Sequence, residues 1–394
     1  MAKIIYAVNG EGWGHALRSK VVIEHLLEKK HDVVIVTSGK AYEFFKKQYD
    51  DVYDIHHYHI VYENNAVNHF KTVISNLKKS PKGVPKTMYR LFKLLYSWEP
   101  DLVITDFEPF SDFLSKFFLI PVIAIDNINV MVKGDVEVDK KHIVDYILAQ
   151  IVARAFVLSA RKYILTTFFY PELKKPHNTV FVPPAIRSQV LDAKPKKGKH
   201  LLIYQTSASN KAMLKELKKT DEKYIIYGFN ISKKDKNIQF RKFSEQGIVN
   251  DMADAKAVIV NGGFTVVSEA LYLKKPLLSI PVKKQFEQIL NAKYIEKLGY
   301  GMYASRLTAR KLEEFISLIP KYNHNLRYYK QYRNKKLYKE VDKTIRELLK
   351  EKSIGKTLRQ MKKDLNKKVI WYYSTIKKLI SSAFPLSSFP LLCL

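Results

Sequence analysis

The stretch GEGWGH places His15 directly behind three alternating glycines, and it follows the first apolar run of the chain. The glycines are Gly10, Gly12 and Gly14. A glycine-rich turn here often binds a dinucleotide, but the spacing G-x-G-x-G-H differs from G-x-G-x-x-G, and no carboxylate ends the next strand. A P-loop is excluded because no Gly-Lys-Ser/Thr follows. The turn therefore predicts His15 at the start of a helix, where imidazole suits a general base near neutral pH.

A general base of this kind needs a carboxylate that orients its ring and stabilises the charge after proton uptake. Asp106 ends the apolar run DLVIT, and Glu108 follows it two residues later. The carboxyl ends of parallel strands meet at one edge of a sheet, so both side chains could reach His15 there. Glu11, inside the glycine turn, is a third candidate. We predict Asp106 as the partner, and the alternative is a histidine that only caps its helix.

A second glycine turn follows the apolar run AVIV and contains Asn261, Gly262 and Gly263. Glycine lets the backbone approach a ligand closely, and a helix that begins near Thr265 would direct free N–H groups to a phosphate. Glu269 lies about one helical turn further on, where its carboxylate could accept both hydroxyls of a ribose. This turn predicts a nucleotide site.

A third polar group opens another expected helix after the apolar run PLLSIPV. It consists of Glu287, Gln288 and Asn291. Because that helix also follows a strand, we expect these side chains on the same rim of the cleft.

The elements that must position these residues are short, wholly apolar strands that alternate with helices. Such strands are buried on both faces, as in a parallel sheet covered by helices. The expected strands are 3–8, 32–38, 101–106, 120–126, 201–207, 224–230, 257–263 and 276–282, with a helix over 15–30. The predicted fold class is α/β, with two doubly wound, Rossmann-like parallel-sheet domains that face a cleft.

A break rich in proline and lysine separates the two sets of strands. We expect an N-terminal, acceptor-side domain over 1–182, a linker over 183–199 and a C-terminal nucleotide-sugar domain over 200–330. Residues 331–394 are basic with helical periodicity, and they predict an amphipathic helical extension.

The stretch 258–301 resembles the donor-binding motif of GT-B glycosyltransferases, in the group that contains MurG-type N-acetylglucosaminyltransferases and the UDP-glycosyltransferases. The motif here consists of Gly262 or Gly263, Thr265, Ser268-Glu269, Lys275-Pro276, Pro281, Glu287-Gln288 and Asn291-Ala292. The stretch GEGWGHALR resembles the first N-terminal loop of the family, and an archaeal-type MurG-like group carries both G-x-G-x-G-H and N-G-G-F-T. The likeness extends from residue 1 to about residue 330.

The resemblance implies a role for each candidate residue. Glu269 would bind the ribose of the donor, and the backbone at Ile248 would contact its base. Glu287 and Gln288, beside Asn291, would contact the sugar. The residues that would line the diphosphate site are Gly262, Gly263, Thr265, Thr206 and Ser207. His15 would activate the acceptor with Asp106 as its carboxylate. Two positions depart from the family: Asn261 replaces a histidine or arginine, and Phe286-Glu287-Gln288 stands where MurG-type motifs usually have Asp-Arg-Gln.

The resemblance implies inversion at the anomeric carbon in one displacement. The chain has no Asp-x-Asp, so we expect a metal-independent site and no cofactor beyond the nucleotide-sugar. The predicted reaction moves a hexose or N-acetylhexosamine from a UDP-sugar, with UDP-GlcNAc favoured, to a hydroxyl of a lipid-linked or membrane-surface glycan. The alternatives are a UDP-sugar 2-epimerase on the same fold and an inactive basic module that binds membrane or nucleic acid.

The formal net charge is +30, which indicates a polyanionic partner. Basic residues alternate with aromatic ones in 65–98 and 355–394, a pattern that suits an anionic membrane surface. It also suits single-stranded nucleic acid or plain solvated helices. With a glycosyltransferase motif present, we expect peripheral membrane attachment through these two segments, and nucleic acid is the less favoured partner. The single cysteine, Cys393, and the absence of a signal-peptide pattern predict a cytoplasmic protein.

Overall fold

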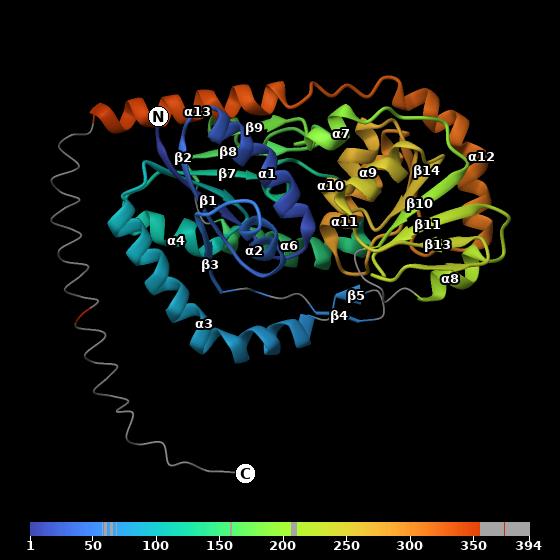
Figure 1. Cartoon of the computed structure of the whole chain (residues 1–394), viewed down its shortest axis with the longest axis horizontal. Coiled ribbons are helices and arrows are strands. Elements are labelled where there is room, and N and C mark those ends of the chain that lie inside the picture. Colours follow the sequence, from blue (N-terminus) through green and yellow to red (C-terminus); the bar gives the residue numbers. More distant parts are fainter. Residues whose placement is uncertain are drawn as a thin grey trace, which may run out of the picture.

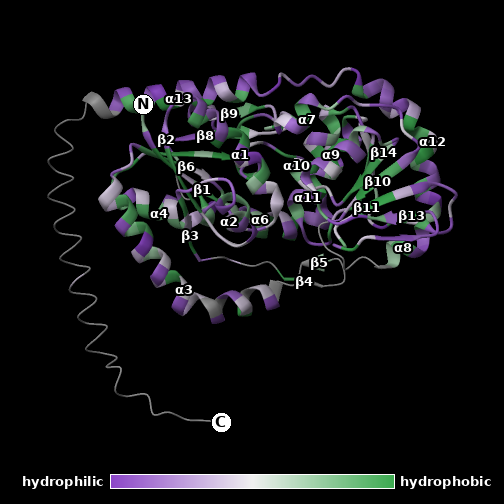
Figure 2. Cartoon of the chain, viewed as in Figure 1, coloured by the Kyte–Doolittle hydropathy of each residue, from purple (hydrophilic) through white to green (hydrophobic). Residues whose placement is uncertain are grey.

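The computed structural model describes residues 1–56, 58, 61–63, 66–67, 69–157, 160–205, 211–354 and 374. Two α/β domains lie side by side, each with a central sheet enclosed by helices (Figure 1). Figure 2 shows that the strands of both sheets are predominantly hydrophobic, whereas the helices combine hydrophilic and hydrophobic residues. The expected fold class is therefore confirmed. None of the helices in the described part of the chain combines the length and the apolar composition that a membrane crossing requires.

The N-terminal domain has a wholly parallel seven-stranded sheet in the order β3-β2-β1-β6-β7-β8-β9. Its strands are β1 (Lys3–Val8), β2 (Asp32–Thr37), β3 (Val52–Asp54), β6 (Leu102–Asp106), β7 (Val122–Asp126), β8 (Lys162–Thr166) and β9 (Thr179–Val182). The order reverses between β1 and β6, where a doubly wound sheet forms its ligand-binding crevice. Sequence reasoning missed β3, β8 and β9.

Helices cover both faces of this sheet. They are α1 (Trp13–Glu28), α2 (Gly39–Lys46), α3 (His69–Trp98), α4 (Pro109–Phe117), α5 (Val130–Lys133) and α6 (Ile143–Phe156), with 3-10 turns at Lys140–His142 and Pro176–Asn178. A small hairpin of β4 (Tyr62–Glu63) and β5 (Ala66–Val67) precedes α3 and reaches the C-terminal domain, because Ala66 forms a bridge with Lys283.

The C-terminal domain repeats this design with the order β12-β13-β11-β10-β14-β15-β16, in which only β12 is antiparallel to its neighbour. Its strands are β10 (His200–Tyr204), β11 (Lys223–Tyr227), β12 (Lys233–Asp235), β13 (Ile238–Phe240), β14 (Ala257–Val260), β15 (Leu277–Ser279) and β16 (Gly301–Tyr303). Its helices are α8 (Lys211–Leu217), α9 (Glu245–Ala253), α10 (Phe264–Tyr272), α11 (Phe286–Lys297) and α12 (Ala309–Leu326). The order reverses between β10 and β14, so the glycine turn after β14 lies at the crevice.

Two segments connect the domains. The expected linker contains the short helix α7 (Ser188–Asp192). Helix α13 (Lys335–Ile354) runs back along the N-terminal domain (Figure 1). Its side chains Leu337, Val341, Ile345 and Leu348 are buried in the same apolar cluster as α1 and β1. Residues 335–354 therefore pack on the N-terminal core, whereas residues 355–373 and 375–394 of the expected tail lie outside the described part of the chain.

Candidate functional site

The first glycine turn leads from β1 directly into α1. Asn9 fixes the turn, because its side-chain amide donates to the carbonyl of Phe107 at 3.0 Å and its Oδ1 accepts the N–H of Glu11 at 2.8 Å. Gly12 adopts a φ of +76°, in the left-handed region where glycine is favoured, and caps α1. His15 therefore lies in the first turn of α1, as expected.

His15 contacts the carboxylate that ends β6. Its Nδ1 lies 3.0 Å from Oδ1 of Asp106, which is 1 % exposed. The alternative partner, Glu108, instead caps α4 by accepting the backbone N–H groups of Phe110 and Ser111, each at 2.8 Å. Of Asp106 and Glu108, Asp106 is thus the one beside the ring, although the catalytic role of either residue stays a prediction.

Arg18, which sequence reasoning did not consider, lies one helical turn after His15 and is buried. Its Nε donates to Asp106 Oδ2 at 2.8 Å, and its Nη2 donates to Oδ1 at 2.5 Å and lies 2.7 Å from His15 Nδ1. Burial alone would raise the pKa of Asp106, but Arg18 and then His15 hold that pKa well below its usual range. The carboxylate is therefore ionised at neutral pH. The sequence feature that could have identified Arg18 is its position three residues after His15, on the same face of the helix.

The second glycine turn lies against the first. Gly262 adopts a φ of +90°, and α10 begins at Phe264 after Gly263. The hydroxyl of Thr265 donates to the carbonyl of Gly14 at 3.0 Å. This bond brings the N-terminus of α10, which suits a phosphate, next to the loop that carries His15.

Glu269 is buried in α10 and forms an ion pair with Arg187, a residue of the expected linker. Arg187 Nε lies 2.6 Å from Oε1 and Nη2 lies 2.9 Å from Oε2. A carboxylate has about four lone-pair positions, so two remain for a ribose diol. The third nitrogen of Arg187, Nη1, is buried without a hydrogen-bond partner among the described residues, and it lies 3.7 Å from Glu245.

The polar group at the start of α11 divides into two roles. Gln288 accepts the backbone N–H of Val282 at 3.0 Å, and Asn291 donates to the carbonyl of Gly262 at 2.9 Å, so both hold the backbone around the second turn. Glu287 instead reaches the other domain, where Oε1 accepts from the side-chain amide of Asn127 at 2.8 Å. Sequence reasoning missed Asn127, which follows β7.

The remaining predicted donor residues are placed less directly. Asn261 is buried and donates to Gln205 at 3.3 Å and to the carbonyl of Ile280 at 3.1 Å. Ile248 lies in α9 within the apolar core, and its N–H donates to Ser244 at 3.0 Å. Thr206 and Ser207 lie outside the described residues. The donor roles of all four stay predictions.

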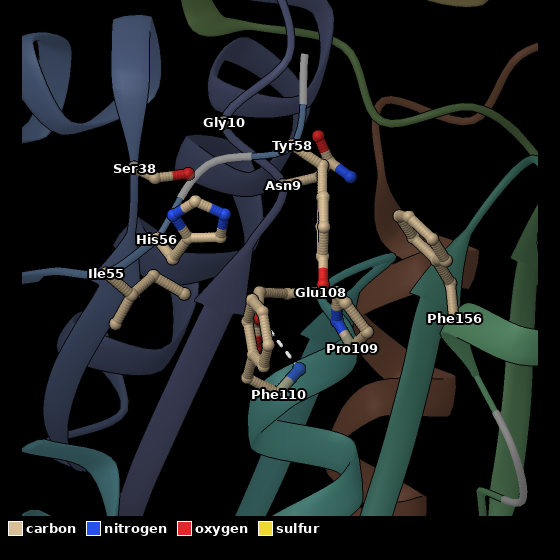
Figure 3. A pocket seen from close by; sticks show the side chains of 10 residues that line it. All are labelled: Asn9, Gly10, Ser38, Ile55, His56, Tyr58, Glu108, Pro109, Phe110 and Phe156. Carbon is tan, nitrogen blue, oxygen red and sulfur yellow. Dashed lines mark hydrogen bonds between the residues drawn. The ribbon is translucent and has the colours of Figure 1, made fainter. Parts of the chain in front are cut away.

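A pocket opens in the N-terminal domain beside the first glycine turn (Figure 3), with about 260 Å³ of empty space, part of it open to solvent. Its lining comes from the turn, the end of β2, the segment before β4 and the ends of α4 and α6: Asn9, Gly10, Ser38, Ile55, His56, Tyr58, Glu108, Pro109, Phe110 and Phe156. Phe107 connects this pocket to His15, because its ring centroid lies 5.0 Å from that of Phe156 and 6.5 Å from that of His15. The aromatic wall and its polar neighbours thus lie next to the candidate base.

No cluster of three or more His, Cys, Asp or Glu side chains that could hold a metal ion occurs among the residues that the structure describes. Metal independence stays a prediction, because the diphosphate of a donor can itself supply ligands.

Comparisons with known proteins find relatives of this chain along most of its length. The model of a family described as glycosyl transferase family 1 matches residues 2–320. An uncharacterized glycosyltransferase of Methanosarcina mazei is 26% identical over 90% of this chain and 99% of its own length. A UDP-N-acetylglucosamine--N-acetylmuramyl-(pentapeptide) pyrophosphoryl-undecaprenol N-acetylglucosamine transferase of Clostridium botulinum is 34% identical, over 32% of this chain and 38% of its own length.

Solved structures share the fold at low sequence identity. Phytolacca americana UGT2, solved with UDP-2fluoro-glucose and pterostilbene, superposes with a TM-score of 0.64 at 13% identity, over 88% of this chain and 99% of its own. Acinetobacter baumannii MurG gives a TM-score of 0.56 at 14% identity, over 86% of this chain and 99% of its own. At such identities these likenesses show the arrangement of the two domains alone.

Proposed function

The chain belongs to glycosyl transferase family 1 and is a glycosyltransferase of the GT-B fold, and we propose that it moves a hexose or N-acetylhexosamine from a nucleotide-sugar to a hydroxyl of a lipid-linked or membrane-surface glycan. The observation that carries the proposal is the pairing of His15 with Asp106 opposite the N-terminus of α10. This arrangement sets a proton acceptor on one side of the cleft and a phosphate site on the other.

The proposed reaction is one displacement with inversion. The acceptor oxygen bonds to the anomeric carbon while the bond from that carbon to the diphosphate oxygen breaks. His15 Nε2 takes the hydroxyl proton, and the ionised Asp106 stabilises the ring when it becomes charged. The free N–H groups at the start of α10 would stabilise the negative charge that develops on the diphosphate.

The donor is proposed to be UDP-linked, with UDP-N-acetylglucosamine favoured. Support comes from the partial relative whose name specifies this donor and from the placement of Glu269, whose two remaining lone-pair positions suit a ribose diol. Glu287 lies on the rim between the domains, where sugar hydroxyls could reach it.

Membrane attachment is proposed through surfaces on the N-terminal domain. The basic residues of α3 lie on its exposed side: Lys78, Lys82, Lys86, Arg90 and Lys93. Helix α6 adds a surface that sequence reasoning missed, a stripe of six exposed aliphatic side chains: Ile143, Val144, Ile147, Leu148, Ile151 and Val152. Exposed Lys140, Lys141 and Arg154 flank the ends of this stripe.

An apolar stripe with basic flanks fits the interface of an anionic bilayer. Phe156 ends α6 and lines the pocket near His15, so a bilayer that contacts the stripe would present acceptors close to the base. Residues 355–373 and 375–394, which hold most of the second predicted attachment segment, lie outside the described part of the chain.

The experiment that tests this function supplies radiolabelled UDP-N-acetylglucosamine and a lipid extract to the purified chain. We expect label in the lipid fraction, release of UDP that depends on the extract, an inverted anomeric linkage by NMR, and full activity in EDTA. A sugar whose configuration at carbon 2 has changed, with no label in the lipid fraction, would indicate an epimerase instead. Activity that EDTA abolishes and magnesium restores would contradict metal independence.

A further inference from the structure

Arg18 and Asp106 compete for the same nitrogen of His15. Nη2 of Arg18 lies 2.7 Å from Nδ1, and Oδ1 of Asp106 lies 3.0 Å from it. A guanidinium only donates hydrogen bonds, and an ionised carboxylate only accepts them. One nitrogen of a neutral ring either donates or accepts, so only one of the two contacts is a hydrogen bond at a time.

The two tautomers of the ring differ in whether His15 can act as a base. With the proton on Nδ1, the ring donates to Asp106 and Nε2 is free to take a proton from an acceptor hydroxyl. With the proton on Nε2, Nδ1 accepts from Arg18 and the neutral ring has no free nitrogen left. The second tautomer is therefore a resting form.

The contacts around Asp106 favour the resting form in the donor-free protein. The carboxylate does not depend on His15, because Arg18 donates to both of its oxygens and Ser19 Oγ donates to Oδ2 at 2.8 Å. Burial lowers the pKa of Arg18, but Asp106 more than offsets this and keeps the pKa above its ordinary value, so the guanidinium stays charged. The contact of Arg18 with Nδ1 is the shorter of the two, at 2.7 Å against 3.0 Å for Asp106.

We propose that Arg18 is a positioning residue that holds His15 in the resting tautomer until the sugar of the donor is bound. The proposal rests on the role of His15 as the base in the proposed function. No proton is gained or lost in the change: one leaves Nε2 for water, and one returns from water to Nδ1.

A chain of hydrogen bonds connects Arg18 to the sugar side of the cleft. Nη1 of Arg18 donates to Oδ1 of Asn127, and Nδ2 of Asn127 donates to Glu287 at 2.8 Å. Sugar hydroxyls that bind Glu287 compete with Asn127 for its carboxylate. Once Asn127 leaves Glu287, its amide no longer fixes the guanidinium, which can turn away from Nδ1. The base is then released only when the sugar, and not the nucleotide alone, occupies the site.

The first test needs no ligand. NMR of the full chain, with histidines labelled with the heavy nitrogen isotope, reports the tautomer at about pH 8, above the ordinary imidazole pKa of about 6.5. His15→Gln identifies the signal. We expect the proton on Nε2 in the wild type and on Nδ1 in Arg18→Met, because Asp106 is then the remaining neighbour. Arg161→Met removes an exposed arginine that directly precedes β8, at the end of the strand away from the carboxyl ends, and should match the wild type. A proton on Nδ1 in the donor-free wild type would overturn the proposal.

The second test adds UDP-N-acetylglucosamine or UDP. We expect the first to move the proton to Nδ1 and the second to leave it on Nε2. In Asn127→Ala no amide fixes the guanidinium, so we expect the proton on Nδ1 already in the donor-free variant, and the sugar should no longer move it. A tautomer that follows the donor in Asn127→Ala as in the wild type would contradict the proposed route.

The two tests separate this inference from the proposed function. Full turnover in His15→Gln would show that His15 is not the base and would contradict the proposed function. If His15→Gln loses turnover but the tautomer of His15 in the wild type is the same with and without the donor, only the proposed role of Arg18 is contradicted. If Arg18→Met does not fold, the tautomer in the donor-free wild type and the response of Asn127→Ala to the donor still test the role of Arg18.

Discussion

Arg187 and Glu269 form a bidentate ion pair that fastens the segment between the domains to α10. The two hydrogen bonds measure 2.6 Å and 2.9 Å, and both side chains are buried. Each charge compensates the other in a place where neither could stay ionised alone at low cost. The pair therefore holds the candidate ribose ligand in a fixed orientation before the donor arrives.

Removal of one partner should cost more stability than removal of both. Arg187→Met leaves Glu269 buried and uncompensated, for which a loss of about 3–5 kcal/mol in the free energy of unfolding is expected. Arg187→Met combined with Glu269→Gln should recover a large part of this loss. Urea unfolding measures the free energy of unfolding of the single variant, the double variant and a control. Arg333→Met, which breaks the exposed pair with Asp192, should lose no more than about 1 kcal/mol. Equal losses in the single and double variants would contradict the compensation.

Donor binding should depend on the charge of Glu269. Glu269→Gln keeps the shape but exchanges one acceptor oxygen for a donor group, and hydrogen bonds to charged groups contribute about 1.5–3 kcal/mol each. We expect the dissociation constant for UDP-N-acetylglucosamine to rise at least about tenfold, as measured by calorimetry. Unchanged affinity for both UDP and UDP-N-acetylglucosamine would place the ribose elsewhere.

Turnover should depend on His15 and not on a similar histidine of the same helix. His15→Gln is expected to lower kcat by about 100- to 10,000-fold, the usual contribution of a general base, with donor affinity retained. His25 is the matched control, because its Nε2 lies 2.8 Å from Asp342 on α13, far along α1 from the cleft. His25→Gln should reduce thermal stability and leave kcat near the wild-type value. Similar losses of kcat in both variants would point to folding rather than to base catalysis.

Lys275 should make stability rise with pH in the alkaline range. Its ammonium group is buried and donates to the carbonyls of Lys196 at 2.6 Å and Ala255 at 2.8 Å. Burial lowers the pKa of Lys275 to about 8. Between this pH and the unfolded pKa of about 10.4, the unfolded chain binds more protons, so the free energy of unfolding increases with pH. Lys275→Met should flatten this increase in urea unfolding from about pH 7 to about pH 9.5. An equally steep rise in the variant would assign the effect to other groups.

The stripe on α6 should bind anionic bilayers. Ile147→Asp with Ile151→Asp places two charges in its centre, and we expect the double variant to sediment less with phosphatidylglycerol vesicles than the wild type. Val144→Thr keeps the size of an outer side chain and serves as the mild control. Turnover of a soluble acceptor should be unchanged, which separates membrane contact from chemistry. Equal sedimentation of the double variant and the wild type would exclude the stripe as the contact surface.

Much of the fold could be predicted because its signals are local. The wholly apolar runs predicted four strands of each sheet within a few residues: β1, β2, β6 and β7 in the first, and β10, β11, β14 and β15 in the second. Less regular strands were missed, such as β8 and β9, because their burial depends on neighbours rather than on their own pattern. The position of α13 on the N-terminal core was also not readable, since amphipathic periodicity shows that a helix has a buried face but not which surface covers it.

For the candidate site, the sequence by itself determined the two glycine turns, His15, Asp106 and Glu269, since each lies within a few residues of the end of an apolar strand or the start of a helix. Only the tertiary structure decided which groups these residues meet. Arg18 meets Asp106 across 88 residues, Arg187 meets Glu269 across 82 and Asn127 meets Glu287 across 160. Such contacts depend on how two sheets and their side chains face one another across the cleft, and short-range spacing carries no information about that placement.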